Sequence, residues 1–212
     1  MSRVKTPLLS PSRSYNKMYC GFFFFKNMEI FDVPGLTLRH ELKAGALGRL
    51  IEFSGIYGHS DFDYPIAFEG YVATTFAEYV IDPKPRNRLW MVEDEQGLVG
   101  TIGVMDRGDS AQLRWFSVRP DWRENNLGNF LFGAAMEYIQ ENDFQKAWLS
   151  TFSESEIAVA LYKRRGFRIM VETDVEIGGK NYREIVMDDF SQVCERSSQW
   201  CELRYSQVQT AH

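Results

Sequence analysis

The chain has 212 residues, of which 44% are hydrophobic and 25% are charged, and its formal net charge is −5. This length and balance predict one well-packed globular domain with tails. No basic patch large enough for a nucleic-acid backbone is visible, so we expect no nucleic-acid partner; the mild acidity is compatible with a cationic amine substrate, although such a charge usually only aids solubility.

Cysteine usage and the amino-terminal segment indicate the compartment. Cys20, Cys194 and Cys201 form no close-spaced metal pair, and a sparse, odd number of cysteines fits a reducing cytoplasm better than a disulfide framework. The run of phenylalanines at 22–25 is too short for a signal peptide or a membrane span. We therefore expect a cytoplasmic protein with no membrane partner and no metal.

Composition divides the chain into three parts. Residues 1–27 carry Pro, Ser, Arg and Lys without a sustained period and predict a mobile extension. Residues 28–190 hold the periodic segments of the domain, and residues 191–212 predict a loose polar tail. The phenylalanine run in the extension could dock on the domain or on a partner, and the sequence leaves both open.

The first half of the domain reads as one strand, two helices and a hairpin. Alternation over 36–42 predicts a strand, 43–53 predicts a short helix, and 54–64, rich in Gly, Asp, Ser and aromatics, predicts a loop. Pro65 suits the first position of a second helix, which ends near Ile81. The residues expected on the core face of this helix are Phe68, Val72, Phe76, Tyr79 and Val80. Strands follow at 89–92 and 98–105, joined by a turn that ends in glycine.

The centre of the chain reads as a strand, a sharp turn and a helix. Residues 113–118 are mostly apolar and predict a buried strand that Pro120 ends, and apolar residues beyond Asn129 recur at helical spacing. Between them, residues 123–128 form a turn that feeds the helix start. Such a turn aims unpaired N–H groups at one point, where the helix dipole adds positive potential. The sequence therefore predicts an anion site here, for a phosphate or a pyrophosphate.

The last part of the domain reads as a strand, a helix and a closing hairpin. Residues 146–152 predict the strand, and Ser153 with Glu156 predicts a capping box at the start of a helix that Gly166 ends. The residues expected to face the core from this helix are Ile157, Ala160 and Leu161. Strands at 167–177 and 182–187 complete the order βααβββαβαββ.

Two motifs in this order resemble the GCN5-related N-acetyltransferase (GNAT) superfamily. The turn is similar to its acyl-coenzyme A signature: Arg123 and Gly128 match, and Asn126 stands where the first glycine is usual. About forty residues later, Tyr162 precedes Gly166-Phe167 by the four residues of the second family hallmark. Residues 45–78 also resemble, more weakly, the acetyltransferase half of MarR–GNAT fusion proteins, without the winged helix on which a DNA-binding role depends.

The resemblance implies an α+β (α/β) fold with a mixed, mostly antiparallel sheet of about seven strands, flanked by about four helices. The strand that ends at Arg119 and the strand that begins near Lys146 would part in mid-sheet and admit the pantetheine arm of acetyl-CoA, held like an added strand. The residues implied at this coenzyme are, for pantetheine, the backbone of Phe116 and Val118 and the side chain of Ser155, and, for pyrophosphate, the Arg123 side chain and the N–H groups of Asn125, Asn126, Leu127, Gly128 and Asn129.

Alternative readings remain for several of these residues. Arg123 could be a solvated surface arginine, Ser155 could be an ordinary serine of a first helical turn, and the run at 163–165 could meet the 3′-phosphate or only complement a helix dipole. Tyr162 is the implied general acid at the coenzyme sulfur, unless it is only a core tyrosine.

The acceptor site is expected beneath the first two helices and their connection. The candidates there are Tyr57, His59, Asp61 and Glu69, with Asp63 as a further possible base and Tyr64 as part of an aromatic wall. The strand at 112–118 carries no acid, so we expect deprotonation of the amine through water or by a base from elsewhere, for which His59, Asp61, Asp63 and Glu69 are the candidates. The sequence favours an acetyl-CoA-dependent N-acetyltransferase that acts on a small-molecule primary amine. A module that binds acyl-CoA or another ligand without turnover, a protein or peptide N-acetyltransferase, and a homodimer paired through strand edges stay open.

Overall fold

The computed structural model describes residues 33–189. The three cysteines, the phenylalanine run, the predicted extension at 1–27 and the predicted tail at 191–212 therefore lie outside the described residues. Within residues 33–189 the predicted order of strands and helices is confirmed, with one addition, a 3-10 helix η1 before the third α-helix. The elements are β1 Thr37–Arg39, α1 Ala46–Phe62, α2 Ile66–Ile81, β2 Arg88–Asp94, β3 Gly97–Arg107, β4 Ser110–Val118, η1 Pro120–Asn125, α3 Leu127–Glu141, β5 Lys146–Phe152, α4 Glu156–Arg164, β6 Phe167–Ile177 and β7 Lys180–Asp189.

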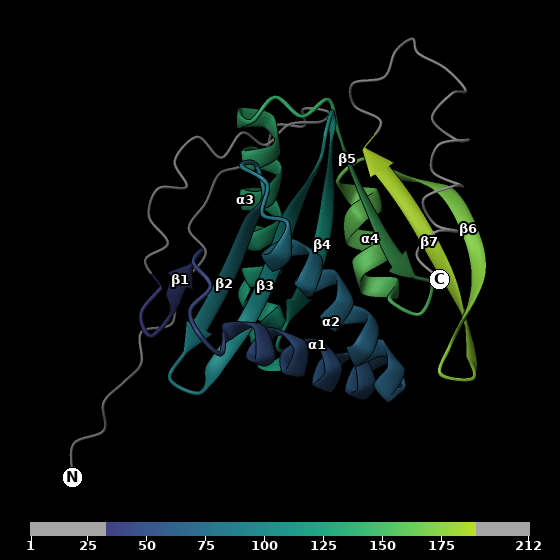
Figure 1. Ribbon diagram of the computed structural model, residues 1–212, viewed down its shortest axis with the longest axis horizontal. Coiled ribbons are helices and arrows are strands. Elements are labelled where there is room, and N and C mark those ends of the chain that lie inside the picture. Colours follow the sequence, from purple (N-terminus) through teal and green to yellow (C-terminus); the bar gives the residue numbers. More distant parts are fainter. Residues whose placement is uncertain (1–32, 190–212) are drawn as a thin grey trace, which may run out of the picture.

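The described strands form one seven-stranded sheet in the order β1-β2-β3-β4-β5-β7-β6. Every neighbouring pair is antiparallel except β4 and β5, which run parallel. Figure 1 shows the β6–β7 hairpin at the side of the sheet opposite to β1. The predicted mixed, mostly antiparallel sheet is therefore confirmed.

The sheet parts between β4 and β5. Their pairing lasts only from Ser110 opposite Lys146 to Leu113 opposite Leu149. Beyond that point β5 continues beside β7, and β4 continues beside β3 with a register shift that gives β4 one extra residue. Trp115 lies at this bulge with a φ of 53°. Because a bulge bends and twists its strand, β4 turns away from β5, and the predicted mid-sheet splay is present.

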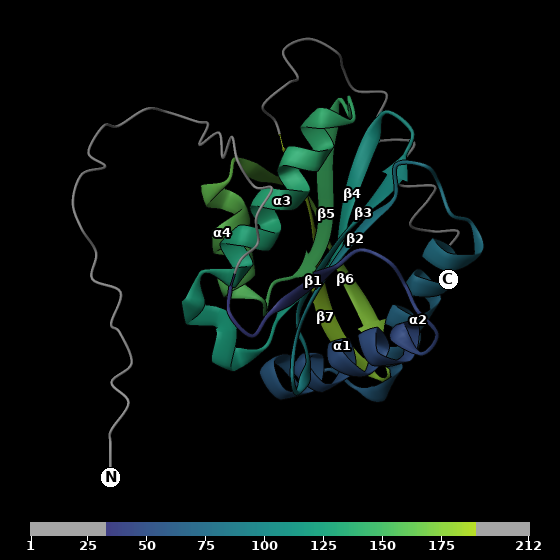
Figure 2. The same ribbon diagram turned by 90° about the vertical axis from the view of Figure 1, so that its left-hand side faces the viewer.

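Helices cover both faces of the sheet. Figure 2 shows α3 and α4 on one side of the strands and α2 on the other. Two glycines of β3 show what covers each face: a side chain on Gly100 would meet Leu127 and Leu131 of α3, and one on Gly103 would meet the indole of Trp115. That indole stacks on Phe76 of α2, with ring centroids 4.1 Å apart. The α1–α2 face and the α3–α4 face therefore have separate apolar cores.

The predicted loop at 54–64 is wrong, because α1 continues to Phe62. Its glycines are not breaks but contact points with α2. A methyl group on Gly55 would lie 2.4 Å from Glu69, and one on Gly58 would lie 2.8 Å from the Phe68 ring. Tertiary packing thus overrides the weak helix propensity of glycine. The second helix begins one residue later than predicted, at Ile66, with Pro65 as its N-cap.

Two predicted core faces need correction. In α4 the predicted inward residues are on the wrong face: Ile157 is 82% exposed, Ala160 is exposed and Leu161 is only half-buried. The helix starts at Glu156 with Ser155 as N-cap and without the predicted capping box, and it buries Val159 and Tyr162 instead. The aromatic rings on the α3–α4 face of the sheet determine which side of α4 is buried. In α2, Val80 is also exposed rather than in the core.

Two element ends differ as well. The first strand covers only three residues of the predicted 36–42 stretch, and α3 begins at Leu127, two residues before Asn129. Among the helices of residues 33–189, none is long and apolar enough to cross a membrane.

The contact between α1 and α2 can be tested with two glycines. Gly58→Ala should lower the free energy of unfolding by about 1 kcal/mol, because its methyl group would overlap a rigid ring of α2. Gly70→Ala, in α2, has no atom within 4 Å of the new methyl group and should raise that free energy by about 0.5–1 kcal/mol. Urea denaturation measures both; equal effects of the two substitutions would contradict the close approach at Gly58.

Candidate active site

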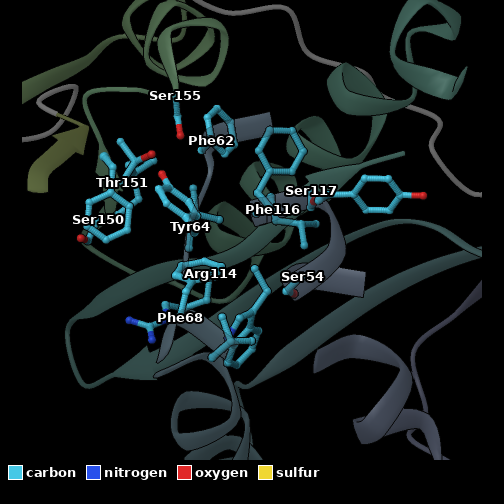
Figure 3. A pocket seen from close by; sticks show the side chains of 18 of the residues that line it. Ser54, Phe62, Tyr64, Phe68, Arg114, Phe116, Ser117, Ser150, Thr151 and Ser155 are labelled. Atoms are coloured by element: carbon cyan, nitrogen blue, oxygen red, sulfur yellow. The ribbon is translucent and has the colours of Figure 1, made fainter. Parts of the chain in front are cut away.

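A pocket of about 180 Å³ lies where β4 and β5 part (Figure 3). Its wall combines residues from both faces of the sheet. From the α1–α2 face come Tyr57, Tyr64 and Phe68, and from the α3–α4 face come Phe132 and Tyr162. The pocket therefore passes through the sheet, so two ligands that enter from opposite faces could meet in it.

The strand edge beside the pocket lacks its sheet neighbour. After Leu113, the remaining residues of β4 have no partner in β5, so this edge can accept an extended ligand that carries amides. Phe116 and Val118, predicted to bind pantetheine, lie on this stretch, and Phe116 lines the pocket. The carbonyl oxygen of Val118 already accepts a hydrogen bond of 2.9 Å from Arg123 Nε.

The bend at residues 123–128 has the open amides that the sequence predicts. Asn126 adopts the left-handed conformation, with a φ of 62°, and is the N-cap of α3. The N–H of Phe130 makes the first backbone bond of the helix, to the Asn126 carbonyl at 3.0 Å, so the N–H groups of Leu127, Gly128 and Asn129 precede it. Asparagine adopts this conformation more readily than most residues, so the turn does not need glycine at 126.

Side chains around the bend leave those amides open. The Asn126 Oδ1 accepts a hydrogen bond of 2.7 Å from Asn129 Nδ2 and does not cap the helix. Asn125 bonds back to the Asp121 carbonyl at 3.2 Å. Arg165 Nη2 donates to Asn129 Oδ1 at 3.1 Å, which brings a guanidinium to the start of α3. The amides, the helix dipole and Arg165 together suit a phosphate group.

Arg123 points elsewhere than expected. Besides its bond to Val118, its guanidinium pairs with Asp61 at the end of α1. The structure therefore engages this side chain with β4 and α1 and does not turn it toward the amides of α3.

Tyr162 lies at the pocket among aromatic rings. It is 6% exposed, and its ring centroid is 6.2 Å from that of Phe116, 5.8 Å from Phe132 and 6.1 Å from Phe167. Burial raises the pKa of Tyr162, because the low dielectric disfavours the phenolate. The phenol therefore stays protonated through the neutral range and can only donate a proton there.

Ser155 and Tyr64 form a polar spot in the pocket wall. Ser155 is buried at the start of α4, and its side chain does not cap that helix. Figure 3 shows its hydroxyl directed toward the hydroxyl oxygen of Tyr64. Burial raises the pKa of Tyr64 to about 12, and the Ser155 hydroxyl opposes this shift.

The four candidates for the acceptor site divide into two pairs. Tyr57 and Asp61 line the pocket; burial raises the pKa of Tyr57, and Asp61 pairs with Arg123. His59 and Glu69 do not line it. The His59 side chain is 71% exposed, and its Nδ1 lies 3.1 Å from the Tyr64 carbonyl, while Glu69 lies against α1.

Asp63, the further candidate base, bonds to Lys180, the first residue of β7 in the β6–β7 hairpin. That hydrogen bond is the main reason that the pKa of Asp63 is lowered. Its carbonyl accepts a bond of 3.3 Å from the Tyr182 hydroxyl. These contacts tie the α1–α2 turn to the closing hairpin.

Sequence reasoning missed several residues of the pocket. Arg114 and Trp115 line it from β4, and α2 adds Tyr71 and Thr75, to which the indole N–H of Trp115 donates at 2.9 Å. The missing signal was the length of α1, because the wall forms only when α1 and α2 run as full helices over the sheet. Among residues 33–189 no group of three or more His, Cys, Asp or Glu could hold a metal ion.

Comparison with known proteins supports the resemblance. The model of the family described as "Acetyltransferase (GNAT) family" matches residues 53–167, more than half of the chain. The uncharacterized N-acetyltransferase YjgM of Escherichia coli is 30% identical over 93 residues, which are 42% of this chain and 56% of that protein. The matches cover between 38% and 56% of the length of the curated relatives.

Solved structures establish the fold. The ribosomal-protein-S18-alanine N-acetyltransferase of Escherichia coli superposes with a TM-score of 0.57 at 17% identity, over 77% of this chain and 99% of that one. The spermidine N-acetyltransferase of Vibrio cholerae, solved with CoA and spermine, gives 0.52 at 21% identity, over 73% and 94%. With the family description matched across the pocket and the bend, and the fold shared, the chain belongs to the acetyltransferase (GNAT) family.

Proposed function

We propose that this chain transfers an acetyl group from acetyl-CoA to the primary amine of a small molecule. The GNAT family uses acyl-CoA, and the matched family description names acetyl transfer. The observation that carries the proposal is the pocket through the sheet, because it joins an aromatic acceptor side to the coenzyme side at Tyr162.

The residues present fit acyl-CoA. The open amides of the bend and the guanidinium of Arg165 suit the pyrophosphate, and the unpaired edge of β4 suits the amides of pantetheine. When bound, the coenzyme supplies a thioester, whose carbonyl carbon is the electrophile. Ser155, buried in the wall without a capping role, is placed to bond the arm.

Tyr162 serves as the acid of the reaction. As the acceptor nitrogen forms its bond to the carbonyl carbon and the C–S bond breaks, the Tyr162 hydroxyl gives its proton to the departing sulfur. Burial keeps this proton in place until charge develops on sulfur. Asp61, the one carboxylate among the described residues that line the pocket, pairs with Arg123, so the ammonium proton of the acceptor leaves to water before the attack. The second proton, which nitrogen loses as it becomes an amide, restores the Tyr162 hydroxyl through water.

A small acceptor fits better than a peptide. The turn at Gly178 packs against Pro65, where an added methyl group would come within 3.0 Å, and Lys180 pairs with Asp63. These contacts hold the β6–β7 hairpin against the α1–α2 turn, beside Tyr64 of the pocket wall, and so favour a small acceptor over an extended chain on that side. The ribosomal-protein acetyltransferase among the structural matches keeps the peptide acceptor as the alternative.

A binding module without turnover is the second candidate. The absence of an unpaired carboxylate in the described pocket favours it, and the position of Tyr162 favours the enzyme. A thiol-release assay with acetyl-CoA against small amines, polyamines and peptides separates them. We expect release with small amines; coenzyme binding without release for every acceptor would identify the sensor, and release with peptides alone would identify a protein acetyltransferase.

Tyr162→Phe should lower kcat about 100-fold, since the hydroxyl acts only on the leaving sulfur, while the dissociation constant of acetyl-CoA changes little. Steady-state kinetics and calorimetry measure the two quantities. The control is Tyr138→Phe, a half-buried tyrosine of α3 outside the pocket, which should retain wild-type kcat. Unchanged turnover in Tyr162→Phe would remove the acid role.

Asn126→Gly should leave the acetyl-CoA dissociation constant within about threefold of wild type, because the Asn126 side chain bonds Asn129 and leaves the amides open. Asn126→Val should weaken binding about tenfold, since a β-branched residue resists the left-handed conformation. Titration calorimetry measures both. A tenfold gain in Asn126→Gly would mean that the asparagine obstructs the phosphate site.

A further inference from the structure

The charge of the pocket is set by one side chain. Among the described residues that line it, only Asp61 and Arg114 carry a formal charge. Asp61 pairs with Arg123, which lies outside the lining. The charge left for a ligand is therefore that of the Arg114 guanidinium.

Arg114 has no carboxylate partner within residues 33–189. Its guanidinium carbon lies 5.6 Å from the centre of the Tyr71 ring and 5.9 Å from that of Trp115. The pKa of Glu78 is lowered mainly by its hydrogen bond from Arg107, which donates to both of its oxygens, and further by the charge of Arg114. As far as residues 33–189 are concerned, the donors of the Arg114 fork thus remain for a ligand or for water.

The position of Arg114 assigns it to the acceptor side. The bulge in β4 lets the consecutive residues Arg114 and Trp115 both line the pocket, and both rings beside Arg114 belong to the α1–α2 face. Figure 3 shows Arg114 apart from Ser155, the residue proposed to bond the coenzyme arm. The guanidinium is therefore separated from the place of the coenzyme arm.

We propose that the acceptor is an amine that also carries a carboxylate, with an apolar or aromatic body, and that Arg114 determines this specificity. The inference rests on the proposed function and deepens it. A planar guanidinium binds a carboxylate through two parallel hydrogen bonds, and the rings of Tyr64, Phe68 and Tyr71 supply an apolar wall for the rest of the molecule. A polyamine would bring further positive charges next to an unpaired cation.

The test uses acceptor pairs that differ only in the carboxylate: phenylalanine and phenethylamine, tryptophan and tryptamine, leucine and isopentylamine, with spermidine added. Wild-type enzyme should show a higher kcat/KM for the amino acid in at least one pair. Arg114→Gln should reduce the ratio of the two kcat/KM values about 10- to 100-fold, through KM of the amino acid. Arg114→Lys, which keeps the charge but not the fork, should give a smaller reduction.

Arg183→Gln is the matched control. Arg183 lies in β7, pairs with Asp174 of β6 and does not line the pocket, so the ratio should keep its wild-type value. A ratio that falls equally in Arg183→Gln and Arg114→Gln would assign the effect to stability and overturn the proposal.

Binding of the acetylated products gives a readout that needs no turnover. The melting temperature should rise more with N-acetylphenylalanine than with N-acetylphenethylamine in wild type, and this difference should vanish in Arg114→Gln. Thiol release with spermidine or with the decarboxylated amines, but with none of the amino acids, would overturn this inference and leave the proposed function standing. If none of the acceptors causes thiol release although the coenzyme binds tightly, the proposed function is overturned instead.

Discussion

The short parallel pairing between β4 and β5 is the constraint on which the rest of the site depends. It ends at Leu113 and Leu149, and the bulge at Trp115 then turns β4 away. A non-glycine residue in the left-handed region is strained by about 1–3 kcal/mol, so something must hold it. Stacking of the indole on Phe76 and its hydrogen bond to Thr75 hold it from the α2 side. The helix that covers the acceptor side therefore also fixes the opening in the sheet.

Because the opening passes through the sheet, the reaction we propose would bring the two substrates from separate faces to meet in mid-sheet. Arg123 links these faces, since it bonds the end of β4 and pairs with Asp61 at the end of α1. Its side chain is 38% exposed, and such ion pairs contribute only about 0–1 kcal/mol to stability. The consequence of the pair is geometric and electrostatic: it sets α1 beside the bend and removes the pocket's negative charge.

The sequence predicted the order of the elements, because alternation, helical spacing and turn residues are local signals. It also predicted the bend, whose amides follow from a strand, a turn and a helix in succession. It did not predict the length of α1, because Gly55 and Gly58 read as loop residues until Glu69 and Phe68 lie against them. The face of α4 was equally out of reach, since apolar residues occupy two sides of that short helix. Which side is buried depends on the rings of Phe116 in β4 and Phe132 in α3, which are distant in sequence.

The sign of the charge in the pocket is the clearest example of a property that the sequence alone does not predict. The net charge of −5 is compatible with a cationic ligand, yet a bound ligand responds mainly to charges within a Debye length, about 8 Å at physiological ionic strength. At that range the pairing of each carboxylate matters more than the total. Asp61 is matched by Arg123 and Glu78 by Arg107, while Arg114 has no such partner among the described residues. An acidic protein can thus present a cationic pocket, because the tertiary fold decides which charges cancel.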